Sequence, residues 1–459
     1  MTALINQYRK TKNCYTGEIG NYGYAFVPGG SKGIVLLDLK TKNFLDNFIG
    51  LHDTNNIQQR LELLSKNGLI QKIDEDTCDF RFNRNKVKTI SIWLHVSNKC
   101  NLDCHYCYIS GKNSASMSVP VANLCLDKLE HTAREHGLKT ITIRFAGGEP
   151  ILNRKIIAYF AKEVNERFVK NGISTNFIIL TNGTIVDTSL IELILSYSMR
   201  ISFSLDGMKD WHDKTRSFKS KKGSFDKVYK NLELCLKSGI KPTILTTVTP
   251  VNVLGITELS RFLIDIGLPF RYSLYRDDIS KDCDTSNNFI NDLSKVLNNC
   301  YDYYINAINN NGTTSNHQLC DINLSKKPRL RSCDIGYSGV TINHEGRVFL
   351  CQAAMDKNPI GHLSGNRTLL QMAWQQKTFP ELRTKSVYDY KDCKNCQWML
   401  VCAGGCPVTN FNTSGSVASS SPYCNIFKEM IPRLIEIKAL QLLKSHLKTK
   451  TKGGDQCEQ

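Results

Sequence analysis

The spacing of apolar residues changes along the chain, and the first segment has a pattern of its own. Its apolar runs are either short and bounded by glycine or proline, which predicts strands, or recur every three to four residues, which predicts helices. We expect strands at residues 24–27, 34–38 and 69–73 and helices at residues 41–49 and 57–67. These elements predict a small strand–helix module of winged-helix type over residues 1–85. The alternative interpretation is a cap on the segment that follows.

Residues 86–320 alternate between strand and helix patterns. We expect strands at 89–96, 140–145, 176–180, 200–205, 241–248 and 269–275, and helices at 124–136, 154–171, 189–196, 225–238 and 255–266. Such βα repetition favours a parallel sheet, either a barrel or a doubly wound sheet. Because six strands are fewer than the eight of a closed TIM barrel, the pattern predicts an α/β domain built as an open, partial (β/α)6 barrel. Beyond it, residues 277–330 are polar and Asn-rich with little periodicity.

Residues 321–459 contain few long helical patterns before Phe427. Most of the cysteines outside the loop described next, Cys100 to Cys107, also lie in this segment. The chain has 18 cysteines, no apolar signal-peptide stretch at its N-terminus and no apolar run long enough to span a membrane. We therefore expect a cytoplasmic protein with no membrane partner. Because a reducing compartment does not sustain disulfides, the cysteines predict metal or redox chemistry rather than a secreted disulfide scaffold. We expect the C-terminal segment to fold around metal.

The first clustered cysteines, Cys100, Cys104 and Cys107, follow the first strand of the alternating segment. Three thiolates at this spacing on a loop can bind three irons of a [4Fe–4S] cluster, which leaves the fourth iron without a protein ligand. That iron can chelate the amino and carboxylate groups of S-adenosylmethionine (SAM). A structural zinc site would need a fourth protein ligand, for which His105 is the only local candidate.

This loop, with Tyr106 directly before its last cysteine, resembles the signature of the radical SAM superfamily. In that family the aromatic residue lies against the adenine of SAM. Two later segments resemble further motifs of the family. The motif that holds the SAM amino group is matched by Gly147, Gly148, Glu149 and Pro150. The ribose-contacting motif is matched by Ser204, Leu205, Asp206 and Gly207. All of them follow strands, where the loops of a parallel sheet converge on a common site.

Further residues belong to the same predicted edge of the sheet. Thr181, Asn182 and Gly183 end the third strand, and His212 and Arg216 match positions that recur in related enzymes. The resemblance implies that Arg216 pairs with the SAM carboxylate, and a plain surface arginine is the alternative.

A second cysteine array resembles, cysteine for cysteine, the SPASM domain, which carries two auxiliary [4Fe–4S] clusters. The array consists of Cys333, Cys351, Cys393, Cys396, Cys402, Cys406 and Cys424. The resemblance implies that Cys333, Cys351 and Cys406 hold the first auxiliary cluster and that the other four hold the second. Cys320 would complete the first set; otherwise one iron stays open to a substrate thiolate. Zinc ribbons are the alternative for the paired cysteines.

The net charge of +17 would ordinarily suggest a nucleic-acid partner. Three such clusters would contribute about −5 with their thiolates. The lysines and arginines are dispersed along the chain, apart from short runs such as Lys219–Lys222 and the Lys448–Lys452 tail, which are interpreted as solvated faces. An acidic peptide would be attracted equally well. We therefore do not expect a nucleic-acid partner.

The resemblance implies reductive cleavage of SAM to a 5′-deoxyadenosyl radical that abstracts hydrogen from a substrate. It also implies three [4Fe–4S] clusters and an external one-electron donor such as a flavodoxin or a ferredoxin. No residue of the barrel can be assigned as a catalytic base.

The substrate class depends on residues 1–85, which resemble the module by which peptide maturases bind a leader peptide as an added edge strand. We expect an enzyme that installs a thioether or carbon–carbon crosslink in a ribosomally made precursor peptide. The alternatives are maturation of sulfatases to formylglycine, maturation of a protein-derived cofactor, and a non-enzymatic iron–sulfur scaffold.

Overall fold

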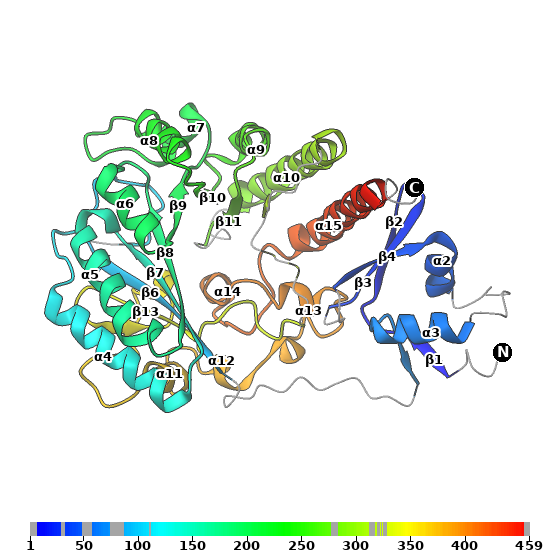
Figure 1. Cartoon of the computed structure of the whole chain (residues 1–459), viewed down its shortest axis with the longest axis horizontal. Helices are drawn as coiled ribbons and strands as arrows, with labels where there is room; N and C mark the ends of the chain where they lie inside the picture. The colour runs from blue at the N-terminus through cyan, green and yellow to red at the C-terminus, as the bar shows by residue number, and fades with distance from the viewer. Residues whose placement is uncertain are drawn as a thin grey trace.

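The fold is described from a computed structural model of the 459-residue chain. The structure describes residues 7–28, 33–47, 57–73, 87–109, 112–276, 283–311, 317–318, 322, 324 and 328–453. Figure 1 shows a large sheet with helices on one side of the molecule and a small sheet at the other side. The long C-terminal helix and several short helices lie between them.

In the described residues of the N-terminal segment there are two small antiparallel sheets and two helices. The strands are β1 (Tyr8–Lys10), β2 (Tyr15–Ile19), β3 (Tyr22–Phe26), β4 (Ile34–Asp38) and β5 (Ile70–Lys72), and the helices are α2 (Leu39–Asn47) and α3 (Ile57–Lys66). β1 pairs with β5, and β3 lies between β2 and β4. Strands β1 and β2 were not expected, because their sequences, YRK and YTGEI, alternate weakly and contain few apolar residues.

The three-stranded sheet of this segment is covered on both faces. Along β3, Ala25 packs into a small core with Leu45 and Leu61 of the two helices. Tyr24 and Phe26 alternate with Ala25 and belong instead to the main core of the molecule. Because successive side chains of a strand point to opposite faces, the sheet is held between its own helices and the remainder of the chain.

The main sheet has ten strands in the order β12-β11-β10-β9-β8-β7-β6-β13-β14-β15. Its central strands are β6 (Thr89–Ser97), β7 (Thr140–Gly147), β8 (Ser174–Thr181), β9 (Arg200–Ser204), β10 (Thr243–Val248) and β11 (Phe270–Leu274). Neighbouring strands from β6 to β11 are parallel. This arrangement confirms the predicted α/β fold with a largely parallel sheet.

The edges of the main sheet were not predicted. β12 (His317–Gln318) pairs with β11, while β13 (Gly339–Ile342), β14 (Arg347–Phe349) and β15 (Gly361–His362) extend the other edge. β13 is parallel to β6, with Gly339 opposite Ser91. The cysteine-rich C-terminal segment therefore begins as part of the barrel sheet.

Helices connect the central strands. They are α4 (Val119–His136), α5 (Arg154–Val164), α6 (Thr188–Ser196), α7 (Lys209–Thr215), α8 (Phe225–Lys237) and α9 (Ile256–Asp265). Alternate residues of β6, such as Ile92 and Leu94, lie in the core with Leu126 and Leu129 of α4. The residues that alternate with them, such as Trp93 and His95, face the opposite side of the sheet. The apolar face of the sheet is thus covered by helices, and the other face carries polar groups.

The expectation of little periodicity over residues 277–330 was wrong for its first half. Residues Cys283–Asn311 form the helix α10, whose buried face includes Leu293, Leu297 and Tyr301. Asparagines on its other face conceal this spacing, since asparagine has a low helix propensity. Packing against α9 and the C-terminal helix stabilises it instead.

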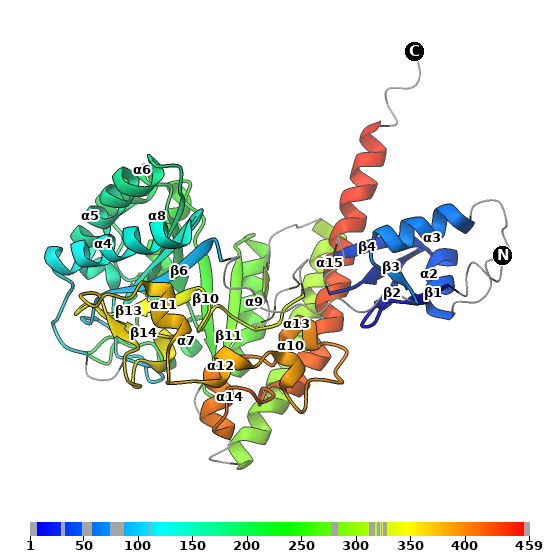
Figure 2. The same ribbon diagram turned by 90° about the horizontal axis from the view of Figure 1, so that it is seen from below.

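The described residues of the C-terminal segment form four short α-helices and one long one, besides two 3-10 turns. The helices are α11 (Leu369–Trp374), α12 (Glu381–Thr384), α13 (Met399–Cys402), α14 (Pro407–Ser414) and α15 (Cys424–Gly453). Figures 1 and 2 both show α15 beside α10 on one side and beside the N-terminal sheet on the other. None of the helices in the described part of the chain is both long and apolar enough to cross a membrane.

Candidate functional site

The three clustered cysteines lie on the loop after β6. Cys100 is buried, while Cys104 and Cys107 are half-buried. Burial is the main cause that raises the pKa of Cys104, to about 11, and the Cys107 thiol raises it further. The pKa of Cys100 is raised mainly by burial, with a contribution from Cys107. The Cys107 thiol therefore lies within electrostatic reach of both other thiols, as expected for ligands of one cluster.

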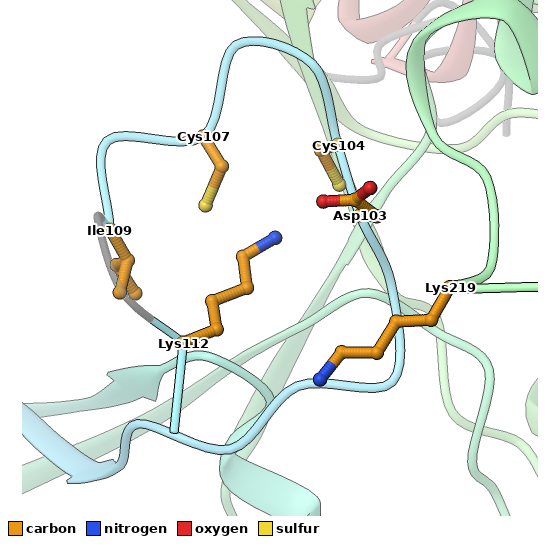
Figure 3. A pocket seen from close by; sticks show the side chains of 6 residues that line it. All are labelled: Asp103, Cys104, Cys107, Ile109, Lys112 and Lys219. Atoms are coloured by element: carbon orange, nitrogen blue, oxygen red, sulfur yellow. The ribbon is translucent and has the colours of Figure 1, made fainter.

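A pocket of about 380 Å³ opens at this loop, lined by Asp103, Cys104, Cys107, Ile109, Lys112 and Lys219. Figure 3 shows the thiol of Cys107 and the ammonium group of Lys112 pointing into it. The Lys112 ammonium also donates to the carbonyl of Leu102, at 3.1 Å. A pocket that combines thiols with two cations suits an anionic iron–sulfur cluster. Lys112 was not identified from the sequence, and Lys219 was noted only as part of a solvated lysine run, because no motif surrounds either residue.

The glycine pair after β7 fits tightly against the backbone that leads to Cys100. A Cβ atom on Gly147 would lie 2.2 Å from the carbonyl oxygen of Ser97, and one on Gly148 would lie 2.4 Å from that of Lys99. Both segments are joined by hydrogen bonds, from Gly148 N to Ser97 O and from Glu149 N to Lys99 O, each 2.8 Å. The two glycines thus allow β7 to support the start of the cysteine loop.

Glu149 is fully buried at the end of β7. One carboxylate oxygen accepts from Ile151 N at 3.0 Å and from Thr181 Oγ1 at 2.7 Å, and the other accepts from Asn182 N at 2.8 Å. Burial raises its pKa to about 7 despite these hydrogen bonds. Protein donors therefore occupy three of the roughly four acceptor positions of a carboxylate, and the predicted contact with the SAM amino group would require this fully buried side chain to become accessible. Pro150 follows at the start of a short 3-10 turn, Pro150–Asn153.

The predicted adenine and ribose residues converge on one carboxylate. Asp206 Oδ2 accepts from Tyr106 Oη, from Thr215 Oγ1 at 3.1 Å and from Arg216 Nε at 2.8 Å. Its Oδ1 accepts from Thr247 N at 3.1 Å. Because protein donors occupy these positions, a ribose contact through this carboxylate would displace one of them. Asp206 holds Tyr106 and Arg216 in place.

Arg216 is not a surface residue, since its side chain is 11% exposed and ion-paired with Asp206. Its guanidinium lies 5.3 Å from the centre of the Tyr106 ring. Its Nη1 lies 3.8 Å from Cys104 Sγ. The cation is therefore directed towards the cysteine loop, where a SAM carboxylate is predicted. Ser204, the last residue of β9, is half-buried at the same edge.

Two asparagines connect the cysteine loop with the end of β8. Asn182 Nδ2 donates to Asn101 Oδ1 at 2.8 Å and lies 4.0 Å from Cys100 Sγ. Asn101 in turn donates to Thr184 Oγ1 at 2.8 Å. This part of the predicted edge, Thr181 to Gly183, thus supports the buried cysteine.

The seven C-terminal cysteines separate into two groups by their mutual electrostatic effects. Cys333 is exposed in the structure, yet neighbouring residues desolvate its thiol. Burial raises the pKa of Cys333 to about 12, and the thiols of Cys406 and Cys351 raise it further. Burial likewise raises the pKa of Cys351, to about 11, with Cys406 as the next cause. These three cysteines are the set implied for the first auxiliary cluster.

The other four cysteines affect one another in the same way. Burial raises the pKa of Cys393 to about 12, and its neighbours Cys402, Cys424 and Cys396 add to the effect. The pKa of Cys402 is raised to about 11, again mainly by burial, with contributions from Cys396 and Cys424. The thiol groups present thus fit the two implied ligand sets. Cys320, the predicted additional ligand of the first set, lies outside the described residues.

The donor chemistry also fits clusters. The cysteines whose side chains the structure describes are all free thiols. Within the described part of the chain, no three His, Cys, Asp or Glu side chains converge closely enough to hold a single metal ion. The thiolates of a [4Fe–4S] cluster each bind a different iron and do not need to converge on one point.

Two family profiles match the chain. Residues 94–261 match the radical SAM superfamily, and residues 333–397 match SPASM, described as an iron–sulfur cluster-binding domain. The chain contains a radical SAM domain followed by a SPASM domain. This combination implies SAM and more than one [4Fe–4S] cluster as cofactors, in agreement with the prediction.

Curated relatives of this radical SAM–SPASM protein are distant. The cysteine-type anaerobic sulfatase-maturating enzyme of Clostridium novyi is 25% identical over 375 residues, which cover 76% of this chain and 96% of the enzyme. The radical SAM cyclopropyl synthase TigE of Paramaledivibacter caminithermalis is 22% identical over 371 residues, which cover 75% of this chain and 74% of the synthase.

Solved structures share the fold. Native anSMEcpe with bound AdoMet superimposes with a TM-score of 0.63 at 20% identity, covering 78% of this chain and 99% of that structure. Streptococcus suis SuiB bound to its precursor peptide SuiA has a TM-score of 0.52 at 16% identity and covers 91% of this chain and 99% of SuiB. At these identities the likeness shows the radical SAM–SPASM fold alone.

Proposed function

We propose that this radical SAM–SPASM enzyme modifies a ribosomally made precursor peptide by installing a thioether or carbon–carbon crosslink. The observation that carries the proposal is a small sheet, β2 to β4, attached to a complete radical SAM–SPASM core. SuiB, whose structure holds a precursor peptide, matches 91% of this chain, whereas anSMEcpe matches 78%. The longer match supports the proposal, although anSMEcpe superimposes with the higher TM-score, 0.63 against 0.52.

The leader of the precursor would add as a strand to an edge of this sheet. Both faces of the sheet are covered, so only its edges are available. In the described residues β2 and β4 pair only with β3. Main-chain hydrogen bonds to such an edge give affinity, and side-chain contacts give selectivity. The domain division proposed is a leader-binding module at 1–85, the radical SAM domain at 86–320 and the SPASM domain at 321–459.

In the radical SAM domain, we assign Cys100, Cys104 and Cys107 to the cluster at which SAM is cleaved reductively to give the radical that abstracts hydrogen from the substrate. Lys112 and Lys219 would offset the negative charge in the pocket, and Arg216 would hold the SAM carboxylate. Glu149 would accept from the SAM amino group at its remaining acceptor position, once the buried side chain becomes accessible. Three clusters in all are proposed, with the two auxiliary ligand sets described above.

We also propose that an external acidic electron donor, such as a flavodoxin or a ferredoxin, docks beside the cluster pocket. A turn with the exposed residues Lys219, Lys221 and Lys222 lies beside the cysteine loop. The turn is attached to the loop through Asp103 N, which donates to Ser217 O at 2.8 Å, and through the ion pair of Lys221 and Asp103. An acidic partner would be attracted to this surface.

Sulfatase maturation is the second candidate, because the Clostridium novyi enzyme named for it matches 76% of this chain. That activity produces a formylglycine aldehyde. The N-terminal sheet favours the peptide-crosslinking alternative, since a leader-binding module has no part in recognising a sulfatase.

The test is an anaerobic assay with SAM, a reductant and the peptide encoded by a short neighbouring reading frame, with a sulfatase-derived cysteine peptide in a parallel reaction. We expect 5′-deoxyadenosine and a precursor that has lost two hydrogen atoms per crosslink and does not react with a hydrazide. The variant with Cys100, Cys104 and Cys107 replaced by alanine should form no 5′-deoxyadenosine. A hydrazide-reactive product from the sulfatase peptide, with an unchanged precursor, would contradict the proposal and favour the second candidate.

A further inference from the structure

One arginine joins the two groups of auxiliary cysteines. Arg329 is half-buried, four residues before Cys333. Its Nη2 donates to the carbonyl oxygen of Ser332, and its Nη1 lies 3.4 Å from the carbonyl oxygen of Val401. Ser332 directly precedes Cys333, and Val401 directly precedes Cys402. One guanidinium group therefore contacts the backbone immediately before a cysteine of each set.

The backbone of the arginine strengthens the same connection. Arg329 N donates to Leu400 O at 2.9 Å. Burial lowers the pKa of Arg329, and the thiols of Cys333 and Cys402 act in the opposite direction. Both thiols therefore lie within electrostatic reach of the guanidinium. An arginine remains protonated in proteins at neutral pH, so its charge is permanent.

We propose that Arg329 is a positioning residue that holds the two auxiliary cluster sites together and places a fixed positive charge between them. This inference rests on the ligand sets assigned under the proposed function. An oxidised cluster carries about −1 with three thiolates and about −2 with four. Two such charges repel each other, and a cation between them reduces this repulsion.

The charge has a consequence for electron transfer. Reduction adds one negative charge to a cluster, and a nearby cation stabilises the reduced form relative to the oxidised form. Arg329 therefore raises the reduction potential of the auxiliary clusters and makes them better acceptors of an electron from the substrate. A neutral side chain at position 329 would lower that potential, whereas lysine would keep the charge without the forked hydrogen bonds.

The surrounding contacts allow the residue to be changed without unfolding its segment. The next residue, Leu330, packs against a small core that includes Val387 and Met399. Its carbonyl accepts from Val387 N at 3.1 Å. These contacts do not involve the guanidinium, so we expect Arg329 variants to fold.

The experiment compares full-length, anaerobically reconstituted wild type with Arg329→Gln, Arg329→Lys and the control Arg367→Gln. Arg367 belongs to the same domain and also donates to a backbone carbonyl, that of Ile360 at 3.0 Å. Iron content is measured for each protein. Midpoint potentials are obtained by redox titration followed by electron paramagnetic resonance, and the SAM-cleaving cluster is recognised by the change in its signal on addition of SAM.

We expect Arg329→Gln to shift at least one auxiliary potential to a more negative value, or to lose auxiliary iron, while Arg329→Lys and Arg367→Gln stay close to wild type. Auxiliary potentials that do not change in Arg329→Gln would overturn the inference. Equal shifts or equal iron loss in the glutamine and lysine variants would also overturn it, because the charge would then have no effect of its own. Wild type without auxiliary signals would instead refute the cluster assignment.

Discussion

The phenol ring of Tyr15 on β2 packs against the indole ring of Trp398 in the cysteine-rich C-terminal segment, with ring centroids 5.2 Å apart. Tyr24 and Phe26 of the neighbouring strand extend this contact into the main core. The N-terminal module is therefore joined to the segment that carries the auxiliary cysteines. Deleting the module would expose Trp398, which is 3% exposed in the intact chain, so a truncation would not separate a loss of leader binding from a loss of stability.

Hydrogen exchange on the intact protein avoids this difficulty. We expect the precursor peptide to slow amide exchange in β2 or β4, because an added strand provides hydrogen-bond partners for an edge that pairs with no second strand among the described residues. A precursor with a scrambled leader is the control and should leave both strands unchanged. Modification of the authentic precursor without slower exchange in either strand would contradict leader binding at this sheet.

The βα alternation predicted the central strands of the barrel because each of them combines a helix-covered apolar face with short connections. The sequence did not predict β13, although it pairs with β6, because four residues carry little pattern and a distant strand determines their position. The same reason hid α10, whose apolar face is meaningful only with its partners α9 and α15.

For the site, the spacing of cysteines located the thiol groups, and the structure adds how they are supported. Asp206 was predicted from a motif as a ribose contact, yet its carboxylate is occupied by Tyr106, Thr215 and Arg216. The contact between Tyr106 and Asp206 joins residues that are 100 positions apart in the chain, so the motif alone could not show it. Lys112 and Arg329 lack any motif, and only their three-dimensional positions relate them to the clusters.

The buried pair of Asp206 and Arg216 leads to a prediction for stability. Asp206→Asn should destabilise the radical SAM domain by roughly 3–5 kcal/mol, because the arginine would remain buried without its counter-ion. Urea unfolding of the anaerobically reconstituted protein measures this loss. SAM cleavage should decrease as well, since Tyr106 and Arg216 would lose their anchor.

A matched control is Asp187→Asn, which removes the charge from a partly exposed pair with Arg154. Its effect should stay below about 1 kcal/mol, as for other exposed ion pairs. Equal stability losses in the two variants would show that the burial of the Asp206–Arg216 pair does not increase its contribution to stability.

The second stability prediction concerns pH and His212. Its Nδ1 accepts from Asp206 N at 3.3 Å, and its Nε2 lies 2.9 Å from Ser224 Oγ. A neutral imidazole satisfies both contacts, whereas a second proton on Nδ1 would break the first. Burial accordingly lowers the pKa of His212 to about 4, from an ordinary value of 6.5. Below pH 6.5 the unfolded chain binds a proton that the folded protein does not.

The free energy of unfolding should therefore decrease as the pH falls from about 6.5 towards 4, with a loss due to His212 of about 2 kcal/mol at pH 5. In His212→Asn, the side-chain oxygen would accept from Asp206 N without titrating. We expect a lower melting temperature for this variant at pH 7 but a smaller decrease between pH 7 and pH 5 than in wild type. An equal pH dependence in both proteins would exclude His212 as its source.

The last prediction tests the contact between β7 and the cysteine loop. A Cβ atom on Gly148 would lie 2.4 Å from Lys99 O and 2.8 Å from Asn98 O. Backbone atoms cannot move aside as a flexible side chain can, so Gly148→Ala should displace the segment that leads directly to Cys100. A displacement of about 1 Å at a reacting site can slow a reaction on the order of 100-fold. We expect a loss of this size in 5′-deoxyadenosine formation, together with loss of about a third of the iron, roughly four of twelve atoms. The auxiliary iron should remain, because both auxiliary sets lie in the SPASM domain.

Gly239→Ala is the control, since a Cβ atom there meets nothing within 4 Å, although its φ of +78° makes that substitution strained as well. The control should keep its iron and its activity. Wild-type iron content and rate in Gly148→Ala would show that β7 does not support the loop.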